Sequence, residues 1–225
     1  MHFEVLIYAG FDELDALAPF EVLSGLVEAL PAEHSAALVT LDGTEAITAS
    51  HGTVLHPHAA LSERPDVLVV PGGGWSDRDP RTGALDAVRA GVLPAAIAER
   101  HARGTVVASV CTGAMLLSAA GLLRGRPAIT HHSAVADLAA GGARVIEGAR
   151  VVDDGDVLSA GGVTSGLDLG LWLLERFVGP QAALAAEGDG PITAAVVMPA
   201  HGPERFQGSI TEAEDDDIEA FIEEE

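Results

Sequence analysis

The sequence predicts an α/β fold, in which helices cover both faces of a mostly parallel β-sheet. Short apolar segments such as 66–70 and 105–110 are rich in β-branched residues, as strands buried on both faces are. They alternate with helical segments, which favours strand–helix–strand units. With 225 residues, 48% of them hydrophobic, the chain can bury a sizeable core. We expect a single domain over residues 1–200 and an acidic C-terminal tail over 201–225.

Residues 3–9 (FEVLIYA) predict the first strand, and residues 12–30 predict a helix. Pro19 is tolerated near the start of that helix. The expected apolar stripe consists of Leu14, Leu17, Val22, Leu26 and Leu30. Asp15 then lies beyond the carboxyl end of the first strand, where the sites of open α/β sheets assemble. Its plainer interpretation is a helix cap or a solvated carboxylate.

Residues 35–42 predict a second strand, and residues 46–57 a short β excursion through a glycine. Three histidines lie in or next to this excursion: His51, His56 and His58. They have no carboxylate or cysteine partner at a recognised metal spacing, so we interpret them as surface residues. Zinc binding is the weaker alternative.

The strand predicted at 66–70 runs into Pro71-Gly72-Gly73-Gly74-Trp75. Three glycines permit positive φ and a close approach of the backbone. Such a loop can direct N–H groups at a developing oxyanion, and the alternative is a flexible turn. It is not a phosphate loop, because no Gly-Lys-Ser/Thr follows.

Residues 81–103 predict helix with a break near 91–94, and Gly104 ends it. A buried strand at 105–110 then turns directly into a helix at 114–120. Cys111, the only cysteine, stands at this junction. Free N–H groups and the helix dipole favour a thiolate there, and small flanking residues are typical of a nucleophile elbow. The alternative is a small buried hydrophobic residue.

Residues 128–133 predict a short strand that leads to a helix capped by Ser133. His131 lies where the strand ends and could orient the Cys111 thiolate or exchange a proton with it. A lone histidine is otherwise structural.

The remaining segments complete the sheet. Strands are expected at 144–146, 150–153 and 157–160, the last two joined as a hairpin across Asp154-Gly155. Helices are expected at 163–178 and 181–187, and an edge strand or subunit contact at 192–198. In the acidic tail, Ile218, Phe221 and Ile222 fit one face of a short helix, with a solvated tail as the alternative.

The composition restricts the function classes. A formal net charge of −22 argues against nucleic-acid binding. All twelve basic residues are arginine, and this acidic, lysine-free composition is typical of a halophile's cytoplasmic protein. The alternative is GC-rich codon bias plus an acidic tail. No apolar segment is long enough to cross a membrane, so no membrane contact is expected. A single cysteine suits a reducing cytoplasm.

Four motifs in order resemble the DJ-1/PfpI superfamily over about residues 3–185: Leu14-Asp15-x-x-x-Pro19-x-Glu21-Val22, Asp66 to Gly73 (DVLVVPGG), Ser109 to Ala114 (SVCTGA) and Ser159 to Asp168 (SAGGVTSGLD). The resemblance implies the class I glutamine-amidotransferase-like fold, a flavodoxin-like sheet, and a homodimer.

Within that superfamily the pair Cys111-Thr112 is most similar to the isocyanide hydratase group and to the related domain of AraC-type regulators. His132 departs from that group, where tryptophan is common. The regulators carry a helix-turn-helix domain, and the roughly forty mostly acidic residues that follow here are too few for one. We therefore expect no DNA binding.

The resemblance implies a hydratase that turns an isocyanide into an N-substituted formamide without metal or organic cofactor. Cys111 would attack, and Asp15 would act as acid or base with a raised pKa. Backbone N–H groups of Gly73 and Thr112 would stabilise negative charge, and the Thr112 hydroxyl would position water. Gly72 and His131 are further candidates. Glyoxalase-like carbonyl repair and non-enzymatic redox or stress sensing remain alternatives.

Overall fold

The computed structural model describes residues 1–27, 34–75, 83–187 and 197–199. The strands are β1 His2–Leu6, β2 Ser35–Thr40, β3 Ile47–Thr48, β4 Val54–Leu55, β5 Ala59–Ala60, β6 Val67–Val70, β7 Val106–Val110, β8 Pro127–Ala128, β9 Arg144–Val145, β10 Val151–Asp153, β11 Val157–Ala160 and β12 Val197–Pro199. The helices are α1 Glu13–Val27, α2 Ala84–Ala90, α3 Val92–Ala102, α4 Gly113–Ala119, the 3₁₀ turn η1 His132–Ala134, α5 Val135–Ala140, α6 Ser165–Phe177 and α7 Pro180–Glu187.

The main sheet has the strand order β12-β10-β11-β7-β6-β1-β2-β5. Its central neighbours are all parallel, and only β10 and β11 pair antiparallel, as the hairpin predicted from Asp154-Gly155. The chain leaves β1 toward β2 and returns to pair β6 with the other side of β1. The carboxyl ends of β1 and β6 therefore flank the point where the strand order reverses, where ligands of such sheets bind.

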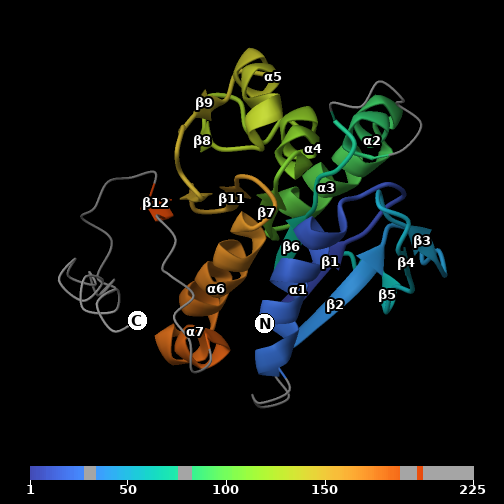
Figure 1. Cartoon of the computed structure of the whole chain (residues 1–225), viewed down its shortest axis with the longest axis vertical. Coiled ribbons are helices and arrows are strands. Elements are labelled where there is room, and N and C mark those ends of the chain that lie inside the picture. The colour runs from blue at the N-terminus through green and yellow to red at the C-terminus, as the bar shows by residue number, and fades with distance from the viewer. Residues whose placement is uncertain (28–33, 76–82, 188–196, 200–225) are drawn as a thin grey trace, which may run out of the picture.

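Two groups of helices cover the sheet, and the predicted α/β fold is confirmed (Figure 1). Helices α1, α6 and α7 pack against one another, as do α2, α3 and α4. The strands between them are buried almost throughout, which agrees with their β-branched composition. No helix within the described ranges is long and apolar enough to cross a membrane.

The apolar stripe predicted for the first helix is wrong at Leu14, which is 43% exposed. The buried face of α1 lies instead along Ala18, Pro19 and Val22, because α6 approaches it very closely. A Cβ at Gly170 of α6 would lie 2.9 Å from Val22 Cβ. Small residues thus determine the packed face. The predicted stripe position Leu30 lies outside the described residues.

Two further predictions differ from the structure or lie beyond it. Ser133 does not cap the helix that follows it: it lies within η1, where the imidazole Nδ1 of His131 accepts the Ser133 N–H. The edge strand expected at 192–198 is described only as β12, parallel to β10. The acidic tail at 201–225 lies outside the described residues.

Candidate active site

Cys111 adopts a left-handed backbone conformation, with φ +57°. In the described part of the chain it is the only non-glycine residue with positive φ, which marks local strain. Its N–H donates to the carbonyls of Ala160 and Gly161 at 3.0 and 2.8 Å. Its carbonyl accepts the Thr130 hydroxyl at 2.9 Å. The strand–turn–helix elbow expected from the small residues is therefore present, and neighbouring loops hold it.

Glycines let the loop after β6 lie directly against this elbow. A Cβ at Gly113 would lie 2.1 Å from the Val70 carbonyl oxygen, and a Cβ at Gly72 would lie 2.5 Å from both N and Oγ1 of Thr112. Gly73 has φ +118° and a similarly close neighbour in the Asp12 N–H. Any side chain at these positions would separate the loop from the elbow.

The two glycine N–H groups already have acceptors. Gly72 N–H donates to Asp15 Oδ2 at 3.1 Å, and Gly73 N–H donates to Thr112 Oγ1 at 2.9 Å. Gly73 thus fixes the Thr112 side chain, and it can reach a developing anion only if Thr112 turns away. Gly72 fixes the carboxyl instead.

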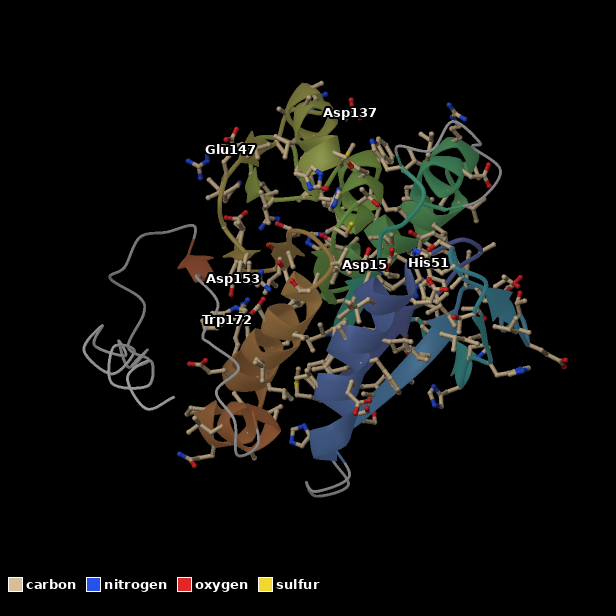
Figure 2. The ribbon with its side chains drawn as sticks, in the orientation of Figure 1. Asp15, His51, Asp137, Glu147, Asp153 and Trp172 are labelled. Atoms are coloured by element: carbon tan, nitrogen blue, oxygen red, sulfur yellow. The ribbon has the colours of Figure 1, made fainter. Side chains whose placement is uncertain are left out.

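Asp15 is completely buried near the start of α1 (Figure 2), next to the loop that follows β6. Oδ2 accepts the Gly72 N–H, whereas Oδ1 has no hydrogen-bond partner of normal geometry among the described residues. Burial, and secondly the charge of Asp12, raise the pKa of Asp15 from 3.8 to about 7. This carboxyl can therefore hold or release a proton near neutrality.

The Cys111 side chain faces this carboxyl and is itself 7% exposed. Burial, and secondly the charge of Asp15, raise the pKa of the Cys111 thiol well above its ordinary value, while the Thr112 N–H opposes the shift. From the sequence, the helix dipole and free N–H groups at this terminus were expected to stabilise the thiolate. In the structure, burial outweighs that effect. The Cys111–Asp15 pair consequently carries one negative charge above about pH 7 and resists a second.

Tyr8 is a site residue that sequence reasoning missed. Its buried hydroxyl donates to the carbonyl of Pro71 at 2.8 Å and reaches that of Gly72 at 3.3 Å. Burial, and then the charge of Asp15, raise the pKa of Tyr8 well above its ordinary value, so it stays a neutral donor. The only sequence signal was its place directly after the first strand.

His131 belongs to a neighbouring loop. Its Nδ1 accepts the Ser133 N–H at 3.3 Å, so the proton of the neutral ring is on Nε2. A Cβ at Gly162 would lie 3.2 Å from its Cδ2, which places the imidazole against the loop after β11. Burial, and secondly the charge of His132, lower the pKa of His131, so it is a neutral N–H donor at pH 7.

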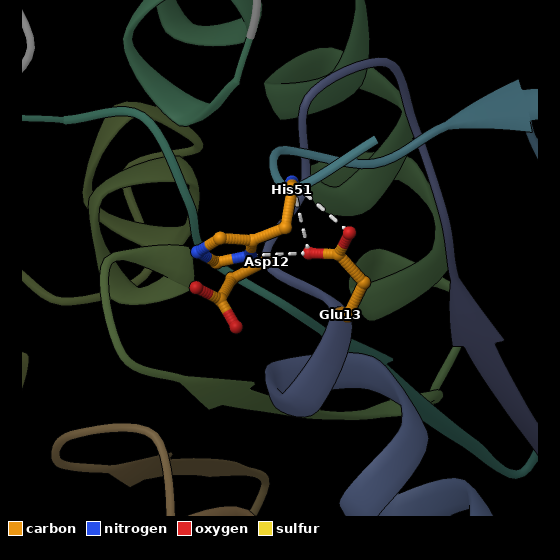
Figure 3. A group of neighbouring side chains, drawn as sticks. All are labelled: Asp12, Glu13 and His51. Carbon is orange, nitrogen blue, oxygen red and sulfur yellow. Dashed lines mark hydrogen bonds and ion pairs between the residues drawn. The ribbon is translucent and has the colours of Figure 1, made fainter. Parts of the chain in front are cut away.

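His51 has a carboxylate partner that its sequence spacing did not reveal (Figure 3). Its Nδ1 lies 2.7 Å from Glu13 Oε2. Both Glu13 oxygens also accept donors from the loop between β3 and β4, including the N–H of His51 at 3.0 Å and that of Thr53 at 3.3 Å. Ligand atoms of Asp12, Glu13 and His51 lie within 4.8 Å of one another. Because Glu13 is saturated with donors, we describe this group as a clasp between the hairpin and α1.

The structure thus brings together Cys111, Asp15, Thr112, Gly72 and Gly73. These residues define the class: an α/β protein with a buried cysteine–carboxyl pair at a strand-to-helix elbow. The chain belongs to the DJ-1/PfpI family, whose profile matches residues 2–176.

Individual relatives agree with this. Isonitrile hydratase from Pseudomonas putida is 34% identical over 183 residues, which cover 79% of this chain and 72% of the hydratase. A ThiJ/PfpI family protein from Pseudomonas syringae superposes with a TM-score of 0.71 at 29% identity, over 85% of this chain and 77% of that one. DJ-1 from Schizosaccharomyces pombe, 19% identical, shares the fold with a TM-score of 0.67 over 85% of this chain and all of its own.

Proposed function

We propose that this chain hydrates an isocyanide, R–N≡C, to the N-substituted formamide R–NH–CHO, with Cys111 as nucleophile and Asp15 as proton carrier. The observation that carries the proposal is the buried Cys111–Asp15 pair, in which the carboxyl faces the thiol and has a pKa of about 7. The 34% identity to isonitrile hydratase supports the substrate class. An isocyanide carbon needs a nucleophile and a proton together, and this pair supplies both.

In the first step the thiol proton passes to the Asp15 carboxylate, and the sulfur attacks the terminal carbon. The S–C bond forms while Asp15 returns the proton to that carbon, which gives the thioimidate R–N=CH–S–Cys111. The Thr112 N–H stabilises the sulfur's negative charge before attack.

In the second step water adds to the thioimidate carbon. Asp15, again a carboxylate, takes one proton from the water and passes it to the nitrogen, which gives R–NH–CH(OH)–S–Cys111. The C–S bond then breaks, the sulfur leaves as thiolate, Asp15 takes the hydroxyl proton, and the formamide is released. Thr112 Oγ1 already accepts the Gly73 N–H, so its own O–H can donate to the incoming water.

The test is formamide production from alkyl and aryl isocyanides, with the wild type, Cys111→Ala, Asp15→Asn and the surface control Ser24→Ala. We expect Cys111→Ala to lose turnover, Asp15→Asn to lose about 10²–10⁴-fold, and Ser24→Ala to match the wild type. Normal turnover by Cys111→Ala would exclude the proposal. Cys111-dependent consumption of methylglyoxal would then favour carbonyl repair. Peroxide-dependent partner binding without turnover would favour a redox sensor.

We also propose that the chain acts as a homodimer, as the family resemblance implies. Small-angle scattering in high salt tests this, because a monomeric mass under those conditions contradicts it.

A further inference from the structure

A cavity of about 510 Å³ lies beside the elbow and takes no part in the proposed chemistry. It is lined by Ile129, Thr130, His132, Val135, Glu147, Gly148, Ala149, Arg150, Gly161, Gly162 and Ser165. Two of these residues form hydrogen bonds with the Cys111 backbone: the Thr130 hydroxyl donates to its carbonyl at 2.9 Å, and the Gly161 carbonyl accepts its N–H at 2.8 Å. The cavity thus shares two walls with the elbow, although Cys111 itself does not line it.

One wall carries the hydroxyl of Ser165. Ser165, the first residue of α6, is only 3% exposed. Its backbone N–H donates to the Gly162 carbonyl at 2.8 Å. Its Oγ makes no hydrogen bond within the part of the chain that the structure describes, and it is not one of the fully buried polar atoms there that lack a partner. As a hydroxyl on the wall of the cavity, it can donate to a molecule bound there.

Arg150 adds a second donor, which is held in a fixed position. Its Nε donates to Asp168 Oδ2 at 2.7 Å, and its Nη2 donates to Thr164 Oγ1 at 3.2 Å. Asp168 is 5% exposed, so the ion pair is anchored inside the protein. Nη1 makes no bond within the described ranges. The guanidinium therefore presents N–H groups to the cavity with its charge already balanced.

The charges around the cavity disfavour an anionic ligand. Asp168 offsets Arg150, and Glu147 adds a carboxylate on the loop after β9, at a distance from Asp15 (Figure 2). The side chains of Ile129, Val135 and Ala149 provide apolar walls. Hydrogen-bond donors without net positive charge suit an uncharged acceptor attached to an apolar body.

We propose that this cavity binds an apolar organic group carrying an uncharged hydrogen-bond-accepting oxygen, with Ser165 and Arg150 as its donors. Such a group can come from either of two sources: the tail of the isocyanide substrate, or a separate molecule. The first source rests on the proposed function, whereas the binding chemistry does not.

The binding test compares three cyclic compounds on the whole chain by calorimetry: oxane, cyclohexane and cyclohexanecarboxylate. The first two differ by one ether oxygen in place of a methylene. We expect the oxane to bind about tenfold more tightly than the other two, which is the size of one additional hydrogen bond. Ser165→Ala should reduce this preference, because it removes one of the two donors, and Ser24→Ala should preserve it. Equal binding of oxane and cyclohexane, tighter binding of the carboxylate, or a preference unchanged in Ser165→Ala would overturn the proposal.

The turnover test separates the two sources by comparing oxan-4-yl isocyanide with cyclohexyl isocyanide. If the cavity holds the substrate's tail, the oxane substrate has a several-fold lower KM at similar kcat, and Ser165→Ala reduces the difference. If a separate molecule binds, the two KM values agree while the calorimetric preference remains. If neither isocyanide is turned over, the proposed function fails while the calorimetric result still decides the cavity's chemistry.

Discussion

The backbone N–H of Gly72 donates to Oδ2 of Asp15 over 3.1 Å, which joins the loop after β6 to the first turn of α1. A backbone donor thus orients the carboxyl that faces Cys111. On the other side of this loop, the Gly73 N–H fixes the Thr112 hydroxyl. The site is assembled from main-chain contacts between segments far apart in the sequence, and its sensitivity to substitution follows from them.

Gly72→Ala should disrupt the site sterically. The new Cβ would lie 2.5 Å from two Thr112 atoms, so loop and elbow must separate. We expect a loss of about 1–3 kcal/mol in unfolding free energy, measured by denaturant titration. Gly25→Ala is the matched control, because that exposed α1 position has nothing within 4 Å of an added Cβ, and it should gain up to ~1 kcal/mol. Unfolding of Gly72→Ala at the wild-type denaturant midpoint contradicts the steric argument.

Asp15→Asn should lower the pKa of the Cys111 thiol. After burial, the Asp15 charge is the largest cause that raises this pKa, and asparagine removes that charge while keeping the shape. Thiolate absorbance or the rate of alkylation against pH measures the shift. Asp12→Asn should act in the same direction but less, since the charge of Asp12 is a smaller cause. An unchanged or raised thiol pKa in Asp15→Asn would mean that the two groups do not interact.

Asp15 also makes the stability of the protein depend on pH. Its pKa is about 7 in the folded chain against an ordinary 3.8, so the folded state binds more protons between these values. Stability therefore falls as pH rises through this window. The unfolding free energy of Asp15→Asn relative to that of the wild type should be higher at pH 8 than at pH 4, by at most roughly 4 kcal/mol. Melting curves at both pH values provide the comparison, in which any cost of the amide itself cancels. A pH-independent difference would argue against the raised pKa.

Glu13→Gln should loosen the hairpin of β3 and β4. Burial raises the pKa of Glu13, but hydrogen bonds from the His51 imidazole and from backbone N–H groups outweigh burial and lower this pKa to about 2. The same contact with Glu13 raises the pKa of His51. Because the pKa of Glu13 is lowered on folding, its carboxylate stabilises the folded protein above pH 4.5, the ordinary pKa of this group. Because the pKa of His51 is raised, its imidazolium stabilises the folded protein below pH 6.5, so the clasp is strongest between these pH values.

We expect the variant to return the pKa of His51 toward its ordinary value and to speed amide exchange at Ser50 to Thr53. NMR titration and hydrogen exchange measure these changes, with Glu21→Gln as the control on an exposed face of α1. Unchanged exchange would show that other contacts secure the hairpin.

The net charge of −22 predicts salt-dependent stability. Repulsion between carboxylates opposes the folded state, and added salt screens it. The melting temperature should rise from low KCl to molar KCl. A flat or falling melting temperature would favour codon bias over halophily as the origin of this composition.

The sequence was sufficient wherever a local pattern determines the structure. The buried β-branched segment before Cys111 and the small residues after it predicted β7, the elbow and α4. The hairpin at Asp154-Gly155 followed in the same way from turn chemistry.

Features that depend on contacts between distant segments could not be predicted in this way. The pKa of Cys111 depends on its depth and on Asp15, 96 positions earlier, and neither is visible in the local pattern. His51 pairs with Glu13 across 38 positions. Leu14 fitted a helical stripe but faces solvent, because glycines in α6 determine which face of α1 is buried.

The left-handed conformation at position 111 has a consequence for the evolution of the site. Three hydrogen bonds hold it, to Ala160, Gly161 and Thr130, and all three use main-chain atoms of residue 111. The identity of the side chain does not enter into them. A different small nucleophile at this position would therefore be presented to the same buried carboxyl without remodelling of any loop. The fold thus fixes the position of residue 111 through its backbone alone, whichever small nucleophilic side chain stands there.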